Sequence, residues 1–530
     1  MHTRPRIRTA VAIAFAAASA LVLAGCSGGN SGNNSDGESA GTLVIDAAFS
    51  IETADPGHTY DPTGNMVAKA MYETLVDFEG SDVSTPVAGL ATWEANDAAT
   101  EFTFTLEDGR VFSDGSPVTA DDVVFSLQRI QGMEEAKPNF LLAGVTIEKV
   151  DDSTVRFTTD TPLLQLPAIL ANPALGIVNS KVVEDNGGAT DGSDTAQAFL
   201  DGESAGSGPY ILDTLDVTSQ VVLTKNPEYN GDEEPAYDRV VIRNVTEAAT
   251  QLINLRGGDT MVAMDLNGDQ VAGLGDGFTV DSVPSGQTIF LLLNQSPELA
   301  GDLANVKIAE AIRYGLDYDS LLELAGAGAT QATGVIPAGF EGALADGIEQ
   351  DLDHAKAALA ESGYAGQTVT LQFPNDYPVG GVDLTSLAER VQDQLSQIGL
   401  TVELAPAPVA TQLDKYVNGQ EAFSMWFWGP DYADSANFLP FGPGLKVGLR
   451  ANWTADADPE LAQLAADTAA ATDPAERTAG FTAFAEAMQE RGPFVPLIVP
   501  GRNISSVDTV QGAVYNSVWE IDIAEITPAG

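Results

Sequence analysis

The C-terminal half of the chain carries the clearest alternation of hydrophobic and polar positions. Residues 369–373 alternate in the manner of a strand with one buried face, and residues 400–404 repeat the pattern. Between them, apolar residues recur once per helical turn over positions 387–398, and Gly399 follows where glycine commonly ends a helix. This strand–helix–strand order predicts two parallel strands joined by a right-handed crossover.

The segment 421–439 joins a strand pattern to a polar turn. From position 423 to 428 the odd-numbered residues fall on one face and the even-numbered residues, which include two tryptophans, on the other. A Gly-Pro pair then ends the run, and an acidic turn follows. Functional side chains often lie on loops at the ends of rigid strands, so a ligand-binding strand end and a core strand with a polar turn both stay open. The candidate ligand contacts in this segment are Trp426, Trp428, Asp431 and Tyr432.

Three further segments complete an α/β pattern. The continuous apolar run 288–293 predicts a buried strand. Thr119 precedes an acidic first turn and an apolar stripe, which predicts that a helix begins there. Residues 102–106 alternate, a turn follows, and residues 111–112 are apolar again, which predicts a hairpin. Hairpins mixed with strand–helix–strand units favour α/β lobes over a single barrel.

Composition adds size and charge to this picture. The chain has 530 residues, enough for two or three domains. It contains 24 Lys and Arg residues against 76 Asp and Glu residues, a formal net charge of −52. This balance argues against a nucleic-acid partner, because a phosphate backbone needs a basic surface. The acidity either keeps the protein soluble or favours cationic ligands, and both interpretations stay open.

The N-terminus has the pattern of an export signal. Basic residues precede an apolar stretch over 10–22 that is too short to span a bilayer comfortably. The sequence Leu-Ala-Gly-Cys then ends at Cys26, the single cysteine of the chain, and resembles the lipobox of bacterial lipoproteins. We therefore expect residues 1–25 to be a signal peptide, Cys26 to carry a lipid anchor, and residues 26–41 to form a flexible tether. An ordinary signal peptide with a chance cysteine is the alternative.

Several longer blocks keep a fixed order along the chain. They are MYETLV at 71–76, the stretch 101–129, GSGPY at 206–210, LTKNPEY at 223–229 and NVKIAEAIRYGLD at 305–317. Together they resemble the bacterial extracellular solute-binding protein family 5, whose members are the peptide- and nickel-binding components of ABC importers. The resemblance covers nearly all of residues 42–530.

The resemblance implies a two-lobed, periplasmic-binding-protein-like α/β clamp of the class II type. Lobe I would combine residues 42–82, 206–287 and 503–530, with residues 83–205 as an extra inserted subdomain. Lobe II would run over residues 288–502. Two chain crossings near 284–287 and 500–503 would form the hinge, and ligand would close the lobes by bridging them.

The resemblance also implies ligand contacts. Trp428 and Asp431 match positions that line the ligand cavity of the family, and in peptide-binding members the matching carboxylate holds the α-ammonium group of the ligand. A buried charge of this kind needs a partner of opposite charge. The Pro-, Gly- and Asp-rich loop 53–66 adds His58 and Tyr60 to the candidate ligand-binding residues.

Some relatives bind the C-terminal carboxylate of a peptide with an arginine, and this chain lacks that arginine at the expected places. Met425 occupies the place of the arginine that some relatives carry a few positions before the tryptophan that matches Trp428, and the loop 375–385 contains no arginine. Longer peptides, whose ends need not be bound, stay open as ligands. An oligosaccharide or a metal chelate also stays open.

Catalytic and metal-binding patterns are weak. The chain has three histidines and no His/Cys spacing that fits zinc, and Gln270 stands where a calcium loop starting at Asp265 needs glycine. Asp431 and Asp434 could act as a glycosidase pair, so a secreted polysaccharide hydrolase is a third hypothesis. We expect a monomeric binding protein without cofactor, metal or catalytic activity. It would sit on the outer face of the cytoplasmic membrane and pass a small ligand, a peptide in the first place, to an ABC permease and ATPase complex.

Overall fold

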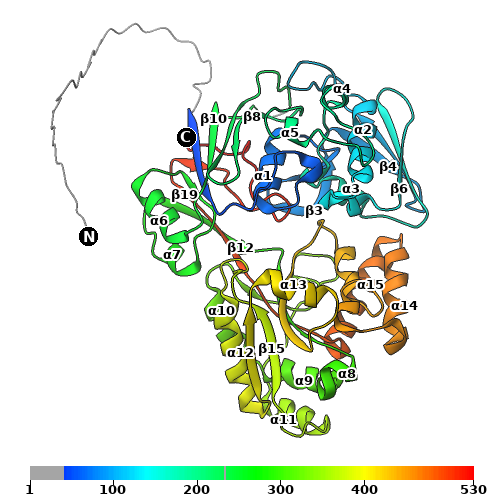
Figure 1. Ribbon diagram of the computed structural model, residues 1–530, viewed down its shortest axis with the longest axis vertical. Helices are drawn as coiled ribbons and strands as arrows, with labels where there is room; N and C mark the ends of the chain where they lie inside the picture. The colour runs from blue at the N-terminus through cyan, green and yellow to red at the C-terminus, as the bar shows by residue number, and fades with distance from the viewer. Residues whose placement is uncertain (1–40, 232–233) are drawn as a thin grey trace, which may run out of the picture. The chain divides into compact units, whose positions relative to one another are not determined.

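The computed structural model describes residues 41–231 and 234–530. The expected signal peptide, Cys26 and all of the expected tether except Gly41 lie outside this part of the chain. Two large sheets organise the described residues, and a smaller four-stranded sheet accompanies the first of them (Figure 1). Within the described residues, no helix is both long and apolar enough to cross a membrane.

The first large sheet has seven strands in the order β12-β19-β11-β1-β10-β9-β8, and we call it the sheet of the first lobe. Strand β1 lies at its centre and runs parallel to β10 and β11, while β19 pairs antiparallel with β12. The strands are β1 (Thr42–Ala47), β8 (Tyr210–Asp216), β9 (Gln220–Lys225), β10 (Arg239–Asn244), β11 (Val262–Ala263), β12 (Phe278–Pro284) and β19 (Gly501–Val507). Further elements of this part are η1 (Pro56–His58), α1 (Pro62–Met71), α6 (Ala248–Gly257), α7 (Gly268–Ala272), β20 (Val510–Gln511) and β21 (Thr527–Pro528).

The smaller sheet has the order β4-β5-β7-β6 and lies in residues 91–159. Its strands are β4 (Ala91–Ala95), β5 (Glu101–Leu106), β6 (Val145–Lys149) and β7 (Thr154–Thr159). The hairpin β2 (Val76–Glu79)–β3 (Asp82–Ala88) precedes it, and the helices α2 (Ala120–Gly132), α3 (Leu166–Leu170), α4 (Ser180–Asp185) and α5 (Gln197–Leu200) accompany it.

The structure corrects one prediction and confirms another in this region. The hairpin predicted over residues 102–112 does not form, because β4 and β7 occupy both edges of β5. Val111 instead bridges to Pro117 within its own loop. The helix predicted after Thr119 is confirmed as α2, and the carboxylate of Asp122 accepts a hydrogen bond of 2.9 Å from the Thr119 backbone N–H.

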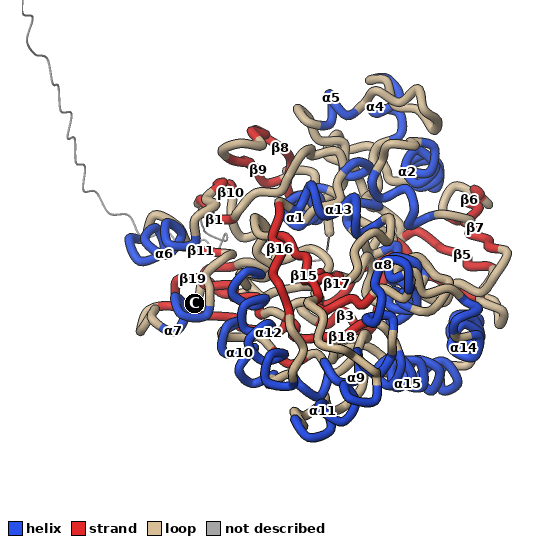
Figure 2. Tube along the Cα trace, turned by 60° about the horizontal axis from the view of Figure 1, so that its bottom comes forward, coloured by secondary structure: helices blue, strands red, loops and turns tan. Residues whose placement is uncertain are grey.

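The second large sheet has six strands in the order β14-β18-β13-β17-β15-β16, and we call it the sheet of the second lobe. In Figure 2, the neighbouring strands β16, β15 and β17 lie side by side as red segments. The strands are β13 (Thr288–Leu293), β14 (Thr330–Gln331), β15 (Val369–Pro374), β16 (Val402–Ala407), β17 (Phe423–Trp428) and β18 (Phe494–Val499). The helices are α8 (Pro297–Ala300), α9 (Val306–Gly315), α10 (Tyr318–Ala325), α11 (Leu352–Glu361), α12 (Leu384–Ile398), α13 (Val409–Val417), α14 (Pro459–Ala470) and α15 (Pro474–Arg491).

Helix α12 confirms the strand–helix–strand prediction. It connects β15 to β16, and these two strands are parallel. Asp383 begins the helix by accepting hydrogen bonds from two backbone N–H groups of the first turn. Gly399 ends it with φ of 94°, a left-handed conformation that glycine adopts without steric cost. The buried strand predicted at 288–293 is also confirmed, since every residue of β13 is buried.

Strand β17 lies in the middle of the second sheet, antiparallel to β13 and parallel to β15. Its two faces pack into different cores, as the alternation predicts. Phe423 and Met425 join the core that contains helices α9 and α12. Trp426 joins the core that contains residues of α14 and α15. The strand is therefore held on both faces, and the turn that follows it starts from a rigid support.

The chain passes between the two large sheets twice. Residues 285–287 connect β12 of the first sheet to β13 of the second. Pro500 alone separates β18 of the second sheet from β19 of the first. The exact lobe boundaries stay a prediction, but these two short connections are the places where a hinge motion between the sheets would concentrate.

Candidate ligand-binding site

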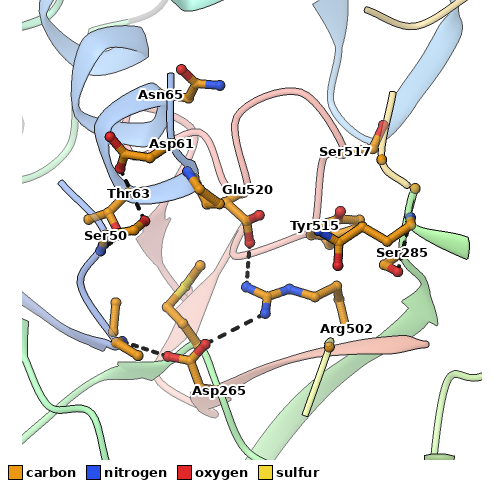
Figure 3. A pocket seen from close by; sticks show the side chains of 18 of the residues that line it. Ser50, Asp61, Thr63, Asn65, Asp265, Ser285, Arg502, Tyr515, Ser517 and Glu520 are labelled. Carbon is orange, nitrogen blue, oxygen red and sulfur yellow. Dashed lines mark hydrogen bonds and ion pairs between the residues drawn. The ribbon is translucent and has the colours of Figure 1, made fainter. Parts of the chain in front are cut away.

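A cavity of about 830 Å³ opens between the residues of the two lobes. This volume lies in the range of small-molecule sites in proteins. The first lobe contributes the ends of β1 and β11, the start of α1 and the C-terminal loop, and the second lobe contributes two loops. The first chain crossing, residues 285–287, and the start of β19 after the second crossing also reach the wall (Figure 3). The lining residues are those at positions 47–50, 60–63, 65–66, 246–248, 264–267, 285–287, 377–378, 380–381, 427, 429–433, 501–503, 515, 517–518 and 520, together with Asn172.

Asp431 joins the turn after β17 to the first lobe. The hydroxyl of Tyr60 donates a hydrogen bond to the Asp431 carboxylate, and the side-chain amide of Asn172 donates to the Asp431 carbonyl at 3.1 Å. Burial and then the neighbouring Asp431 carboxylate raise the pKa of Tyr60, so this tyrosine stays protonated and acts as the donor. Two parts of the first lobe therefore hold one residue of the second lobe at the cavity wall.

Tyr432 lines the cavity beside Asp431 and is partly buried. It packs against the hydrophobic core of the smaller sheet, as does Ala433. Burial and then the nearby carboxylates of Asp434 and Asp431 raise the pKa of Tyr432, which keeps its hydroxyl neutral. Of the residues predicted from the sequence, the structure brings Tyr60, Asp431 and Tyr432 together at the cavity.

The two tryptophans of β17 lie outside the cavity lining. Trp426 is only 2% exposed, stacks on Tyr416 with ring centroids 4.3 Å apart, and donates its indole N–H to Glu421 at 2.7 Å. Trp428 donates its indole N–H to Asn437 at 3.2 Å and packs edge-on against Phe441. Their partners explain this placement, because a buried indole needs an acceptor and both find it within the second lobe.

His58 also lies outside the cavity lining, although Tyr60 two residues later lies within it. It ends the short helix η1 and is half-buried. Its Nε2 is buried and has no hydrogen-bond partner among the described residues. The structure therefore does not bring His58 to Asp431.

The cavity wall contains an arginine that the sequence analysis missed. Arg502 lies at the start of β19, just after the second chain crossing, and its guanidinium forms ion pairs with Glu520 and, at 3.5 Å, with Asp265 (Figure 3). The ring of Tyr515 lies 5.8 Å from the guanidinium carbon. The resemblance implied an arginine a few positions before Trp428 or in the loop 375–385, and neither place holds one. The position of Arg502 inside the predicted crossing 500–503 was the signal that would have found it.

The cluster around Arg502 is partly buried and charged. Burial by itself lowers the pKa of Arg502, but the charges of Glu520 and Asp265 outweigh it and raise the pKa, so the guanidinium stays protonated. Burial raises the pKa of Glu520 despite the neighbouring arginine. Glu520 also has φ of 68°, a left-handed conformation that is costly for a residue other than glycine. Its backbone N–H and carbonyl both bond to Asn516, which holds this conformation in place.

The proposed glycosidase pair does not form in the structure. Asp434 caps the following turn by accepting from the Ala436 N–H at 2.7 Å, and it forms an ion pair with Arg477 at 2.6 Å. It is not among the cavity-lining residues, whereas Asp431 is. The two carboxylates therefore do not face one ligand.

The calcium-like stretch has a structural role as well. Asp265 accepts from the Ala48 N–H at 2.7 Å and from the Gln251 amide at 2.9 Å, and Asn267 caps helix α7. In residues 41–231 and 234–530, no group of three or more His, Cys, Asp or Glu side chains could hold a metal ion.

Known proteins match this chain along most of its length. The sequence model described as bacterial extracellular solute-binding proteins, family 5, matches residues 85–442. The probable D,D-dipeptide-binding periplasmic protein DdpA of Escherichia coli is 30% identical over 491 residues, which are 90% of this chain and 92% of that protein.

Solved structures of the same kind share the fold. The ABC transporter substrate-binding protein CtaP of Listeria monocytogenes superposes with a TM-score of 0.81 at 19% identity, over 93% of this chain and all of that chain. The ABC transporter-associated periplasmic binding protein DppA of Helicobacter pylori, in complex with the peptide STSA, superposes with a TM-score of 0.73 at 22% identity, over 92% of this chain and 98% of that chain. These superpositions confirm the two-lobed α/β fold that the resemblance implied. The match of the family model over most of the chain, with a relative 30% identical over nine-tenths of it, shows that this protein belongs to the bacterial extracellular solute-binding proteins of family 5, which are binding proteins and not enzymes.

Proposed function

We propose that the protein captures a peptide between its two lobes and delivers it to a membrane permease of the ABC type and its ATPase. The observation that carries this proposal is the position of Asp431, a second-lobe carboxylate at the wall of a cavity that both lobes line. Two similar proteins support a peptide as the ligand by their names, one as a probable D,D-dipeptide-binding protein and one as a complex with the peptide STSA. The cavity is large enough for a small molecule of this class.

In this proposal, Asp431 binds the α-ammonium group of the peptide. Its carboxylate has two oxygens, and Tyr60 donates to one of them, Oδ1. An ammonium group that donates to the carboxylate would form a charge-assisted hydrogen bond, which stabilises a complex more than a neutral one does. Because Tyr60 belongs to the first lobe and Asp431 to the second, a ligand held there would also favour the closed arrangement of the lobes.

The remaining parts of the peptide would bind through backbone groups and aromatic surfaces. Tyr377 and Phe427 stack with their ring centroids 5.3 Å apart and an interplanar angle of 3°, and both line the cavity. Extended peptides commonly pair with proteins through main-chain hydrogen bonds, which leave side chains free to vary.

Isothermal titration calorimetry with peptides and their N-acetylated forms tests the role of Asp431. Acetylation removes the ammonium charge, and Asp431→Asn removes the carboxylate charge, so each should weaken binding by about tenfold or more. Asp346→Asn is the matched control, because Asp346 is an exposed carboxylate of the second lobe outside the cavity lining. Equal affinity for free and acetylated peptides would show that Asp431 does not bind an ammonium group.

The nature of the ligand can be tested without choosing peptides beforehand. Native mass spectrometry of the purified protein measures the mass of any ligand that stays bound from the expression host. A peptide mass supports the proposal. An oligosaccharide or a metal chelate, the two alternatives that the sequence leaves open, would replace it.

We further propose that Cys26 carries a lipid that holds the protein on the outer face of the cytoplasmic membrane, where it acts as a monomer. The lipobox-like sequence before Cys26 supports this, and residues 26–41 are long enough to act as a tether. Cys26→Ala should release the protein into the soluble fraction when the full-length chain is expressed in a bacterial host. A protein that stays with the membrane fraction after this substitution would contradict the lipid anchor.

A further inference from the structure

The cavity has a strong charge asymmetry. Its described lining residues include five carboxylates and one cationic side chain, the guanidinium of Arg502. No lysine or histidine is among the described residues of this wall. The carboxylates are Asp61, Glu247, Asp265, Asp431 and Glu520.

The single cation among the described residues of the cavity wall is already neutralised. Arg502 lies between Glu520 and Asp265 and pairs with both (Figure 3). With one guanidinium and two carboxylates, this cluster carries an excess of negative charge. A free carboxylate of a ligand would therefore meet no unpaired cation on this wall, and it would compete with two fixed carboxylates for Arg502.

The acidic residues of the cavity wall differ in how many contacts their carboxylates already make within the protein. Asp61 accepts from the Gly64 N–H at 2.8 Å, and Asp265 accepts from the Ala48 N–H at 2.7 Å, so both have structural partners. Glu247 is different: it is exposed, lines the cavity, and its carboxylate has no hydrogen bond or ion pair among the described residues. Like the second carboxylate oxygen of Asp431, it can therefore be reached by a ligand without displacing a protein contact.

Charges inside a cleft act more strongly than charges on an open surface. Solvent and salt screen exposed charges over roughly 10 Å at 0.1 M ionic strength, whereas low-dielectric walls focus the field of charges that line a cleft. The acidity of the whole chain therefore explains solubility, but the same excess inside the cavity acts directly on a bound molecule. Each positive group of a ligand lowers the repulsion between the wall carboxylates.

We propose that the cavity selects cationic peptides, which carry a lysine or arginine side chain in addition to the α-ammonium group, and that Glu247 binds this second positive charge. This inference rests on the proposed function, because it assigns the class of peptide that the same cavity takes. It also accounts for the lack of an arginine at Met425 and in the loop 375–385, since a site selective for positive charge does not need an anchor for the ligand carboxylate.

A set of matched tetrapeptides tests the selectivity by titration calorimetry. Each peptide has a free N-terminus and three alanines, with lysine, norleucine or glutamate placed in turn at the second, third or fourth position. Norleucine keeps the length and most of the apolar surface of lysine without its charge. At the best position we expect lysine to bind about tenfold more tightly than norleucine, and glutamate to bind about tenfold more weakly. Raising the NaCl concentration should reduce the advantage of lysine.

The variant Glu247→Gln locates the effect. Because the Glu247 carboxylate has no partner to lose among the described residues, the substitution should leave folding intact. The preference for lysine over norleucine should fall severalfold in this variant and stay unchanged in Asp97→Asn. Asp97 is an exposed carboxylate outside the cavity lining and controls for the change in net charge.

The outcomes separate this inference from the proposed function. Norleucine and lysine peptides could bind equally well, and bind only when their N-terminal ammonium group is free. This result would overturn the selectivity for cationic peptides but would leave the capture of peptides standing. A lysine preference that Glu247→Gln does not reduce would overturn the role of Glu247. If none of the tetrapeptides binds, both the selectivity and the capture of short peptides are wrong.

Discussion

Two arginines of this protein, one buried and one partly buried, each lie between two carboxylates, yet their surroundings differ. Arg129 of helix α2 binds Asp55 through two nitrogens, at 2.9 and 2.6 Å, and binds Asp194 at 2.7 Å. It is 1% exposed and does not line the cavity. Arg502 has the same number of acidic partners, but its contact to Asp265 is long, at 3.5 Å, and the cluster borders the cavity at a chain crossing.

The difference shows that the location of an arginine–carboxylate cluster, in the protein interior or at the cavity wall, decides whether it stabilises the fold or acts on a ligand. The Arg129 cluster ties the short helix η1, helix α2 and the loop before α5 together, because Asp55 also caps η1 and Asp194 also accepts from the Ala189 N–H. Its hydrogen bonds are short and numerous, which is what keeps buried charges tolerable. The Arg502 cluster instead links β19 of the first lobe to the C-terminal loop at the cavity wall. At that position its charges contribute directly to the electrostatic potential around a bound ligand.

Breaking the Arg129 cluster should have the largest effect on stability. Arg129→Met leaves Asp55 and Asp194 buried without their counter-charge, and removal of one partner from a buried ion pair costs about 3–5 kcal/mol. Urea unfolding measures this loss. Arg156→Met is the matched control, because Arg156 pairs with Glu148 at 3.0 Å on the surface and such pairs contribute at most about 1 kcal/mol. A loss of equal size in both variants would refute the structural role assigned to Arg129.

Breaking the Arg502 cluster should cost less stability and change binding more. Arg502→Met leaves Glu520 beside Asp265, and an unpaired buried polar or charged group costs about 1–3 kcal/mol or somewhat more. The double variant Arg502→Met/Glu520→Gln should recover part of this loss, because it removes the unpaired charge, and a double-mutant cycle measures the coupling. For a folded Arg502→Met protein, a lysine-containing tetrapeptide should bind more tightly, since the wall has lost its cation. Weaker binding of that peptide would show that Arg502 contacts the ligand favourably.

The two clusters also show how far sequence reasoning reaches. Local periodicity predicted β17, α12 and its end at Gly399, because each depends on residues close together in the chain. Periodicity could not tell which face of β17 meets the ligand, because both faces are covered by hydrophobic cores. The partners of Arg502 come from a loop after β11 and from the C-terminal loop, and no local pattern links such distant positions. The predicted hairpin was wrong for a similar reason, since distant strands took both edges of β5.

Tyr60 offers a smaller test of the contact between the lobes. Tyr60→Phe removes the hydroxyl that donates to Asp431 and keeps the ring that packs against Phe140. A hydrogen bond to a charged group contributes about 1.5–3 kcal/mol, and part of this is recovered by water or ligand, so we expect a change of severalfold in peptide affinity. Small-angle scattering of the ligand-free protein should show a larger radius of gyration than in the wild type. An unchanged radius and affinity would mean that this hydroxyl does not help to hold the lobes together.

The smallest expected effects concern pH, and the two clusters should respond with opposite signs. Burial alone would raise the pKa of Asp194, but its hydrogen bonds from Arg129 and its backbone donors lower it, so the folded state favours the charged form. The stability that Asp194 contributes is then complete above the usual range of an aspartate and is lost as pH falls through its lowered pKa. Urea unfolding at a series of pH values measures this effect. The free energy of unfolding of the wild type should exceed that of Asp194→Asn by less and less as pH falls through this acidic window.

Burial raises the pKa of Glu520, so the folded state favours its protonated form. As pH rises from the usual range of a glutamate through this raised pKa, the folded protein must release a proton that the unfolded chain has already lost. The free energy of unfolding of the wild type, relative to Glu520→Gln, should therefore decrease over that window. An increase with pH for Glu520, like the one expected for Asp194, would mean that Arg502 binds its carboxylate as firmly as Arg129 binds its own partners. The distinction between a structural cluster and a ligand-facing one would then have to be abandoned.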